Sequence, residues 1–163
     1  MEGLERAQKR EQFILEQRWA VHLRDVRRAM LDIEPHIVHF SGHDTREEGL
    51  VFEDETGEAR LLSSDALAEL FKLFVNQIVC VVLNGYYSVR QAEAIAQYVP
   101  YVIGISQEID DRAAIQFITG FYDALGAGRS IEFAYKYGCS TLHLVGISEK
   151  LFPQLVQNTH VPA

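Results

Sequence analysis

The chain contains only two cysteines among its 163 residues, and neither their number nor their spacing suits a disulfide framework or a metal site. Cys80 falls inside a short apolar run and Cys139 inside a helical pattern. Free buried cysteines are typical of a reducing compartment, so the sequence favours a cytoplasmic protein. We expect no bound metal and no cofactor.

Long apolar runs and runs of basic residues are also missing. No stretch approaches the roughly 20 apolar residues that a membrane-spanning helix needs, and residues 1–12 are charged throughout, unlike a targeting segment. The formal net charge is −8 with no basic run to offset it, which argues against nucleic acid or a membrane surface as the partner. With 48% hydrophobic and 23% charged residues, the chain is expected to form one globular domain over residues 1–163.

Residues 77–88, QIVCVVLNGYYS, are the most informative stretch. The apolar run at 78–83 is rich in β-branched residues and too short for a helix, which predicts a strand buried on both faces. The run stops at an Asn-Gly pair. Ser88, with Gln91 three residues later, then predicts a capping box at the start of a helix. The local prediction is therefore a strand, a sharp turn and a helix.

Strand and helix patterns alternate along the rest of the chain. Strands are predicted at 13–21, 36–41, 78–83 and 100–105, a hairpin at 49–62, and helices at 23 to about 32, 63–74, 88–98, 110–126 and 130–142. Residues 1–12 are predicted as a partial N-terminal helix, and 147–163 as a C-terminal tail whose form is left open. This alternation implies βαβ crossovers, and hence an α/β fold with a mostly parallel sheet and helices on both faces, a three-layer αβα arrangement.

Two predicted strand ends carry sequence motifs, HFSGHD at residues 39–44 and LNGYYS at 83–88. With PHIVHFSGH, GLVFEDE, QAEAIA, YVIGIS and FYDALGAGRS in the same order, residues 13–146 resemble the CHAT domain, a caspase-like bacterial peptidase domain of clan CD. The usual motifs of that family are HFSGHG and VLNACYS. The resemblance implies a caspase-like fold whose site pairs a histidine base with a cysteine nucleophile.

Two of the departures from the family motifs bear on the catalytic site. The resemblance makes His43 the base, puts Tyr86 where the nucleophilic cysteine belongs, and puts Asp44 where a glycine lies beside the oxyanion. A phenol with a pKa of about 10 is bulky and poorly ionised at neutral pH, so it cannot replace a thiolate. A carboxylate beside a developing oxyanion opposes the charge that the site must stabilise. Both departures predict a vestigial catalytic site.

Other residues are expected to line the cleft. Since ligands bind beyond the carboxyl ends of parallel strands, Asn84, Gly85 and Tyr87 occupy the expected position, and the tyrosines are predicted to fill the cleft. Asp111 resembles an acidic residue that in some relatives reads a basic side chain, and a helix N-cap explains it equally well. Ser88 is better explained as an N-cap than as a nucleophile.

Three functions remain open from the sequence. The first is an inactive caspase-like domain that serves as a protein-binding or regulatory module, through self-association or a partner. The second is a residual hydrolase that uses His43 as its base. The third is an assembly unit completed by a strand from another chain, because the first strand of such domains is missing before residue 13. The sequence therefore predicts a protein partner or a homodimer.

Overall fold

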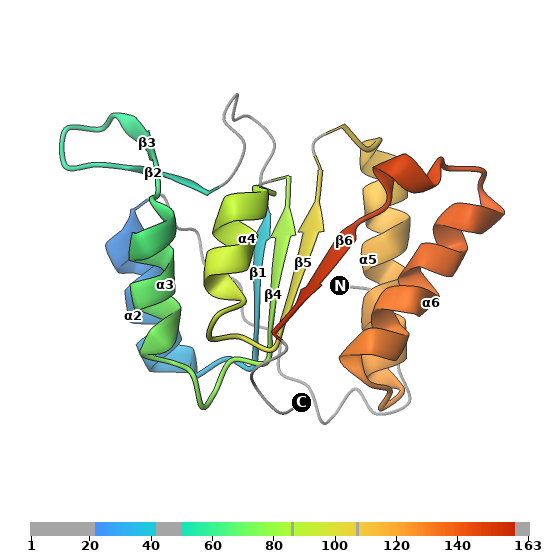
Figure 1. Ribbon diagram of the computed structural model, residues 1–163, viewed down its shortest axis with the longest axis horizontal. Helices are drawn as coiled ribbons and strands as arrows, with labels where there is room; N and C mark the ends of the chain where they lie inside the picture. Colours follow the sequence, from blue (N-terminus) through green and yellow to red (C-terminus); the bar gives the residue numbers. More distant parts are fainter. Residues whose placement is uncertain (1–21, 42–49, 86, 107, 159–163) are drawn as a thin grey trace. The chain divides into compact units, whose positions relative to one another are not determined.

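The computed structural model describes residues 22–41, 50–85, 87–106 and 108–158 (Figure 1). The predicted helix at 1–12 and strand at 13–21 lie outside these residues. The chain divides into two compact units. Among the described residues, one unit consists of 108–153 and the other of everything else. The expectation of a single domain remains a prediction.

A four-stranded sheet forms the centre of the larger unit. Its strands are β1 (Ile37–Ser41), β4 (Cys80–Asn84), β5 (Tyr101–Ile105) and β6 (Gln154–Gln157), in the order β1-β4-β5-β6. The first three run parallel, and β6 pairs antiparallel with β5. The α/β fold class is therefore confirmed, with a mixed sheet.

The C-terminal residues were predicted as a tail of open form, and part of that tail is structured. Gln154–Gln157 form β6, and Glu149–Leu151 form a short 3-10 helix, η2. The residues of β6 carry only two apolar side chains, Leu155 and Val156, which is too short a pattern to identify a strand. Pairing with the buried strand β5 supplies the hydrogen bonds that make this segment a strand.

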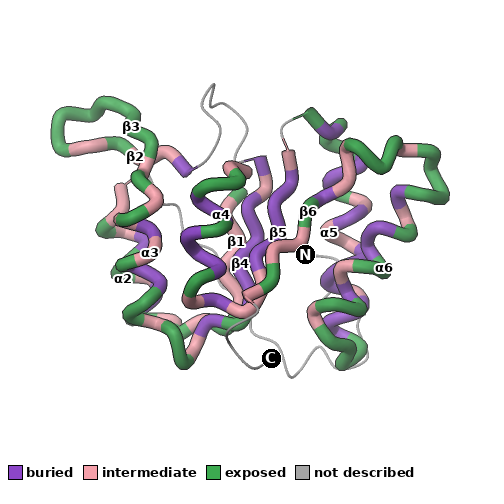
Figure 2. The backbone as a smooth tube through the Cα atoms, in the orientation of Figure 1, coloured by how far each residue is buried: buried purple, intermediate pink, exposed green. Residues whose placement is uncertain are grey.

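Three helices pack on one face of this sheet: α2 (Leu23–Ile33), α3 (Ser64–Lys72) and α4 (Val89–Ile95) (Figures 1 and 2). Alternation along the strands places Val81, Leu83 and Val102 on that face. The helices and strands share one core cluster, which includes Val26, Met30, Leu67, Leu70, Phe71, Val81, Leu83, Ala92, Ile95 and Val102. The apolar periodicity of each helix is therefore explained by burial against the sheet.

The predicted acidic hairpin is confirmed as β2 (Val51–Glu53) and β3 (Ala59–Leu61), which pair antiparallel in a separate two-stranded sheet. Gly57 lies in its turn with a φ of 85°. Residues that have a side chain rarely adopt that backbone conformation, which explains why the turn has glycine at this position.

The smaller unit contains helices α5 (Asp111–Gly126) and α6 (Ile131–Leu144), close to the predicted bounds. A Cβ atom added at Gly138 would lie 2.7 Å from the ring of Phe117 and 2.8 Å from its carbonyl oxygen. The two helices therefore pack closely because Gly138 has no side chain. No helix in the described residues is long and apolar enough to cross a membrane.

Candidate functional site

The carboxyl ends of three parallel strands lie in a row. In the register of the sheet, Ser41 of β1 is opposite Asn84 of β4, and Asn84 is opposite Ile105 of β5. The two sequence motifs therefore leave the sheet side by side, at the edge where α/β proteins place their ligand sites. The first motif departs after Ser41 and the second after Asn84.

Gly85 turns the chain away from β4. Its φ is 80°, a conformation that strains any residue with a side chain. Its N–H donates a 2.9 Å hydrogen bond to the carbonyl oxygen of Ile105, so the turn is tied to the end of the neighbouring strand. Glycine at this position is explained by the turn, and Asn84 and Gly85 lie at the predicted edge.

Three predicted site residues cannot be placed from this structure. His43, Asp44 and Tyr86 lie outside the described residues, so their roles remain predictions. Ser41 and Gly85, which precede these segments, are both described. Ser41 ends β1 opposite Asn84, the residue before Gly85.

Tyr87 packs against the sheet directly after the turn. Its ring lies so close to Gly104 of β5 that a Cβ atom added there would overlap ring atoms. The ring also contacts the core cluster on the α4 face. Partial burial, with a smaller contribution from the charge of Glu93, raises the pKa of the Tyr87 phenol. This phenol is therefore neutral at physiological pH and packs as an aromatic side chain.

A cysteine and a histidine do occur in the sheet, but burial shifts both pKa values in the wrong direction for catalysis. In the register of the sheet, Cys80 is opposite Ile37 and His39 is opposite Val82. Since alternate residues of a strand share a face, Cys80 and His39 lie on the same face of the sheet. Burial raises the pKa of Cys80 to about 12 and lowers that of His39 to about 4. A thiolate–imidazolium pair forms only when the pKa of the thiol is lower than that of the imidazolium. At neutral pH this pair is a neutral thiol and a neutral imidazole.

Cys139, in the smaller unit, is also unsuited to nucleophilic chemistry. It is buried within α6, and burial raises the pKa of its thiol. Its neighbour Tyr135 donates a 2.7 Å hydrogen bond from its hydroxyl to the carbonyl oxygen of Pro153, and burial raises its pKa. These contacts are typical of a packed helix.

Asp111 is the first residue of α5, and its proposed N-cap role is wrong. Asp110 is the N-cap, since its side chain accepts a 2.9 Å hydrogen bond from the N–H of Arg112. The two adjacent aspartates could not be distinguished from sequence because both satisfy the same cap preference. Asp111 belongs to the smaller unit.

Gln91 of α4 is an important residue of this region whose role the sequence did not reveal. The predicted capping box is half correct, because Ser88 accepts a hydrogen bond from the Gln91 N–H at 3.4 Å. The side chain of Gln91 points elsewhere and is only 2% exposed. It accepts a 2.6 Å hydrogen bond from the Leu50 N–H and donates one of 2.6 Å to the Leu62 carbonyl oxygen.

Those contacts make Gln91 the link between the helix that follows β4 and both ends of the hairpin segment. A buried amide offers both a donor and an acceptor, so one side chain satisfies two backbone groups at once. The only sequence signal was a glutamine among the small apolar residues of α4, which the capping box already explained.

No group of three histidine, cysteine, aspartate or glutamate side chains in the described ranges is arranged to hold a metal ion. The described residues of the strand-end region include the hydroxyl of Ser41, the amide of Asn84 and the ring of Tyr87.

Comparison with known proteins identifies the family. The family model for the CHAT domain matches residues 3–136. This chain therefore belongs to the CHAT domain family, a caspase-like, protease-related family. One relative is a Roc-COR-CHAT protease from an unknown prokaryotic organism, which is 24% identical over 129 residues. That alignment covers 76% of this chain and only 12% of the relative.

Proposed function

We propose that this CHAT domain does not cleave peptides and serves instead as a binding or regulatory module for a protein partner. The relative is named a protease, and we infer that this chain has lost the peptidase step. The observation that carries the proposal is the lack of a usable thiol. The family nucleophile position is Tyr86, and both cysteines are buried with raised pKa values.

The chemistry of a cysteine peptidase explains why these features support loss of activity. The thiolate is the attacking species, and it forms readily only when its pKa lies near or below the ambient pH. A thiol with a pKa of about 12, like that of Cys80, is almost entirely protonated at pH 7. Asp44 adds a negative charge where the family has glycine, which works against stabilisation of an oxyanion.

The strand ends nevertheless retain features suited to binding. Gly85 forms the sharp turn after β4, and Tyr87 presents a partly buried ring beside it. Tyrosine combines a large apolar surface with a hydroxyl group, which is why it is frequent at protein interfaces. A peptide segment lying across these strand ends fits that surface.

The test is an assay of the pure chain with peptide substrates that present arginine, lysine or aspartate, together with an activity-based thiol probe. We expect neither turnover nor labelling under native conditions. Turnover or labelling that disappears in His43→Ala would overturn the proposal and favour the residual hydrolase with His43 as base.

A companion experiment restores the family residues with Tyr86→Cys and Asp44→Gly together. If the rest of the site survives, this double variant should gain labelling and slow turnover. Tyr87→Cys is the matched control, because it adds the same thiol one residue further along, where the ring packs on Gly104. Labelling of the control and the double variant at equal rates would contradict a preserved site.

We also propose that the domain associates with a protein partner or with itself. Among the described strands, β1 pairs only with β4, so its second edge could accept a further strand. Exposed strand edges are common sites of strand addition. Light scattering should detect a dimer at micromolar concentration, or a complex once a partner is supplied. A monodisperse monomer that binds no candidate partner would contradict this proposal.

A further inference from the structure

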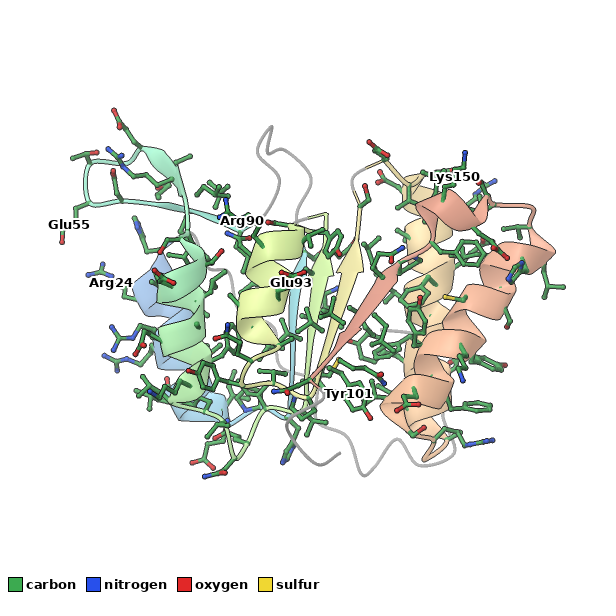
Figure 3. All side chains as sticks on the ribbon, viewed as in Figure 1. Arg24, Glu55, Arg90, Glu93, Tyr101 and Lys150 are labelled. Carbon is green, nitrogen blue, oxygen red and sulfur yellow. The ribbon has the colours of Figure 1, made fainter. Side chains whose placement is uncertain are left out.

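Three arginines share the outer face of helix α2. Arg24, Arg27 and Arg28 are all exposed, and Leu31, one turn further on, is 65% exposed. Spacings of three, four and seven residues place the four side chains on one side of the helix. Figure 3 shows Arg24 pointing outward from α2. The buried residues of this helix are Val26 and Met30. We call the three arginines and Leu31 the arginine face.

The arginine face works against the stability of its own helix. Two of its pairs, Arg24 with Arg27 and Arg24 with Arg28, bring like charges to adjacent positions on the helix surface, which is unfavourable. Arg24 lies in the first turn of α2, where the helix dipole favours negative charge, and the last turn contains no basic residue. Helix stability therefore does not account for Arg24, whereas Arg28 has Asp25 three residues before it and Asp32 four residues after it.

In the part of the chain that the structure describes, these arginines have no ion-pair partner. Within the described chain, the ion pairs join Arg60 to Asp54, Arg60 to Glu58 and His143 to Glu149, and none of the α2 arginines takes part. Guanidinium groups form paired hydrogen bonds with carboxylates, and here they remain available.

The surroundings indicate which kind of anion would be accepted. The acidic hairpin lies beside α2, because the Nδ1 of His22, the N-cap of α2, is 3.1 Å from the Glu53 carbonyl oxygen. Exposed Glu53 and Glu55 and a formal net charge of −8 oppose any densely charged anion, which disfavours nucleic acid and an anionic membrane relative to a protein segment with few carboxylates. A protein segment can place carboxylates opposite the arginines and an apolar side chain on Leu31.

We propose that the arginine face is a docking surface for an acidic segment of a partner protein, one that carries an apolar side chain among its carboxylates. Carboxylates would pair with Arg24, Arg27 and Arg28, and the apolar side chain would cover Leu31. This surface belongs to α2 and not to the strand ends, so it does not depend on the proposed loss of peptidase activity.

The experiment measures fluorescence anisotropy of a labelled peptide of about twelve residues with one Asp-Glu-Leu-Glu segment between neutral residues, titrated with the full chain. Binding should weaken as salt rises toward about 0.15 M. Arg28→Glu should raise the Kd about tenfold, and Arg24→Glu with Arg28→Glu should abolish binding. Leu31→Ser should weaken binding by a smaller factor, which separates the apolar contact from the charges.

Arg112→Glu is the matched control, since Arg112 is an exposed arginine of α5 and its reversal changes the net charge equally. It should change the Kd by no more than about twofold. Arg24→Glu should also leave the thermal midpoint unchanged or slightly higher, because a carboxylate suits the first turn of a helix. Weaker binding without lost stability would distinguish docking from a structural role.

Four outcomes would overturn the proposal. The first is no binding of the acidic peptide by the wild-type chain. The second is an equal loss of affinity in Arg112→Glu and Arg28→Glu. The third is tighter binding of a single-stranded oligonucleotide or phosphatidylserine vesicles, lost in Arg28→Glu, which would identify a polyanion site. The fourth is self-association of the wild type that Arg28→Glu removes, which would identify a second copy as the occupant.

Discussion

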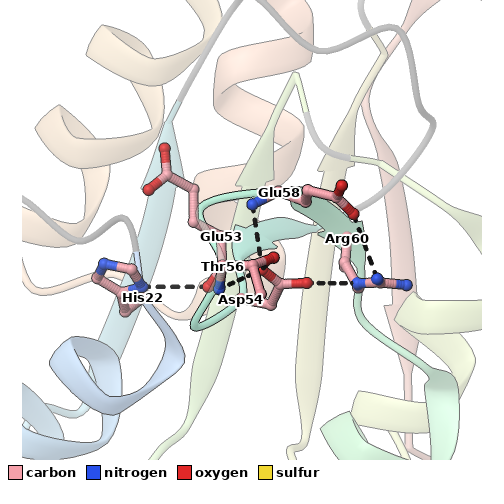
Figure 4. A network of polar contacts seen from close by, with 6 residues as sticks. All are labelled: His22, Glu53, Asp54, Thr56, Glu58 and Arg60. Carbon is pink, nitrogen blue, oxygen red and sulfur yellow. Dashed lines mark hydrogen bonds and ion pairs between the residues drawn. The ribbon is translucent and has the colours of Figure 1, made fainter.

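The two ends of the β2–β3 hairpin are held by different kinds of polar contact. At the base, the uncharged and buried side chain of Gln91 joins the Leu50 N–H to the Leu62 carbonyl oxygen. At the tip, the carboxylate of Asp54 accepts hydrogen bonds from Thr56, Glu58 and Arg60 (Figure 4). The tip has more hydrogen bonds and carries charge. The base has fewer hydrogen bonds and carries no charge.

Exposure to solvent determines which end of the hairpin contributes more to stability. A buried polar group that loses its partner cannot bond to water, so its desolvation cost remains. Exposed ion pairs compete with water and contribute little. The hydrogen bonds from Thr56 and Arg60 hold the pKa of Asp54 well below its ordinary value, yet the carboxylate remains accessible to solvent. The base is therefore expected to dominate.

The largest effect is expected at the base. Gln91→Ala leaves the Leu50 N–H and the Leu62 carbonyl oxygen without this partner, and should lower the free energy of unfolding by about 3 kcal/mol. Urea unfolding monitored by circular dichroism measures it. Gln97→Ala, at an exposed glutamine after the same helix, is the control and should stay within about 0.5 kcal/mol. Equal losses of unfolding free energy in Gln91→Ala and Gln97→Ala would contradict the larger contribution expected of the base.

A similar burial effect should appear in the pH dependence. The pKa of His39 is lowered by burial to about 4, below its usual value near 6.5, so the unfolded state binds more protons between those values. The free energy of unfolding should therefore fall as the pH drops from about 6.5 to about 4, by on the order of 3 kcal/mol.

Denaturant titrations across that pH range test the prediction, with His39→Gln as the variant that should flatten the curve. The lowered pKa of Asp54 acts in a different window. Its contribution is present above its ordinary pKa of about 4 and is lost only as the pH falls below that value. A decline that begins only below pH 4 would assign the acid sensitivity to carboxylates.

Backbone strain at the tip should produce a smaller effect. Gly57 has a φ of 85° with open space around its Cα, so Gly57→Ala adds strain without a clash. We expect a loss of about 1 kcal/mol in the same urea experiment. Gly57→Asn should lose less, because asparagine tolerates this conformation better than alanine. A loss as large as that of Gln91→Ala would show that the turn, not the base, limits stability.

The smallest effect is expected for the charges of the tip. Arg60→Ala removes both ion pairs of the hairpin, and the side chain of Arg60 is 67% exposed. Its effect on unfolding should be too small to separate from that of the Gln97→Ala control, because water replaces the lost contacts. A clear loss at low salt that vanishes at high salt would show that the network acts together.

Much of the fold could be predicted from the sequence where local pattern and burial agree. The apolar run before Asn84 forms β4, and the predicted hairpin at 49–62 forms β2 and β3. The start of α3 at the serine pair 63–64 and the end of α5 at Gly126 also follow from local rules, and the structure selects Ser63 as the N-cap. These features depend on neighbours a few residues apart.

The candidate site was only partly accessible to sequence reasoning. The motifs located the strand ends, and the register of β1 with β4 brings them together. The contact of Tyr87 with Gly104 could not be predicted, because it joins residues on different strands. The same is true of Gln91, whose partners lie 29 and 41 residues away in the sequence.

The sequence by itself determined the α/β class, the family and the absence of a cysteine at position 86, since these depend on residue identity and short-range periodicity. Only the tertiary structure decided that Cys80 is an unreactive thiol, that β6 completes the sheet and that Gln91 anchors the hairpin. The physical reason is that burial and hydrogen-bond partners depend on segments far apart in the chain. They set pKa values and contacts that no local pattern contains.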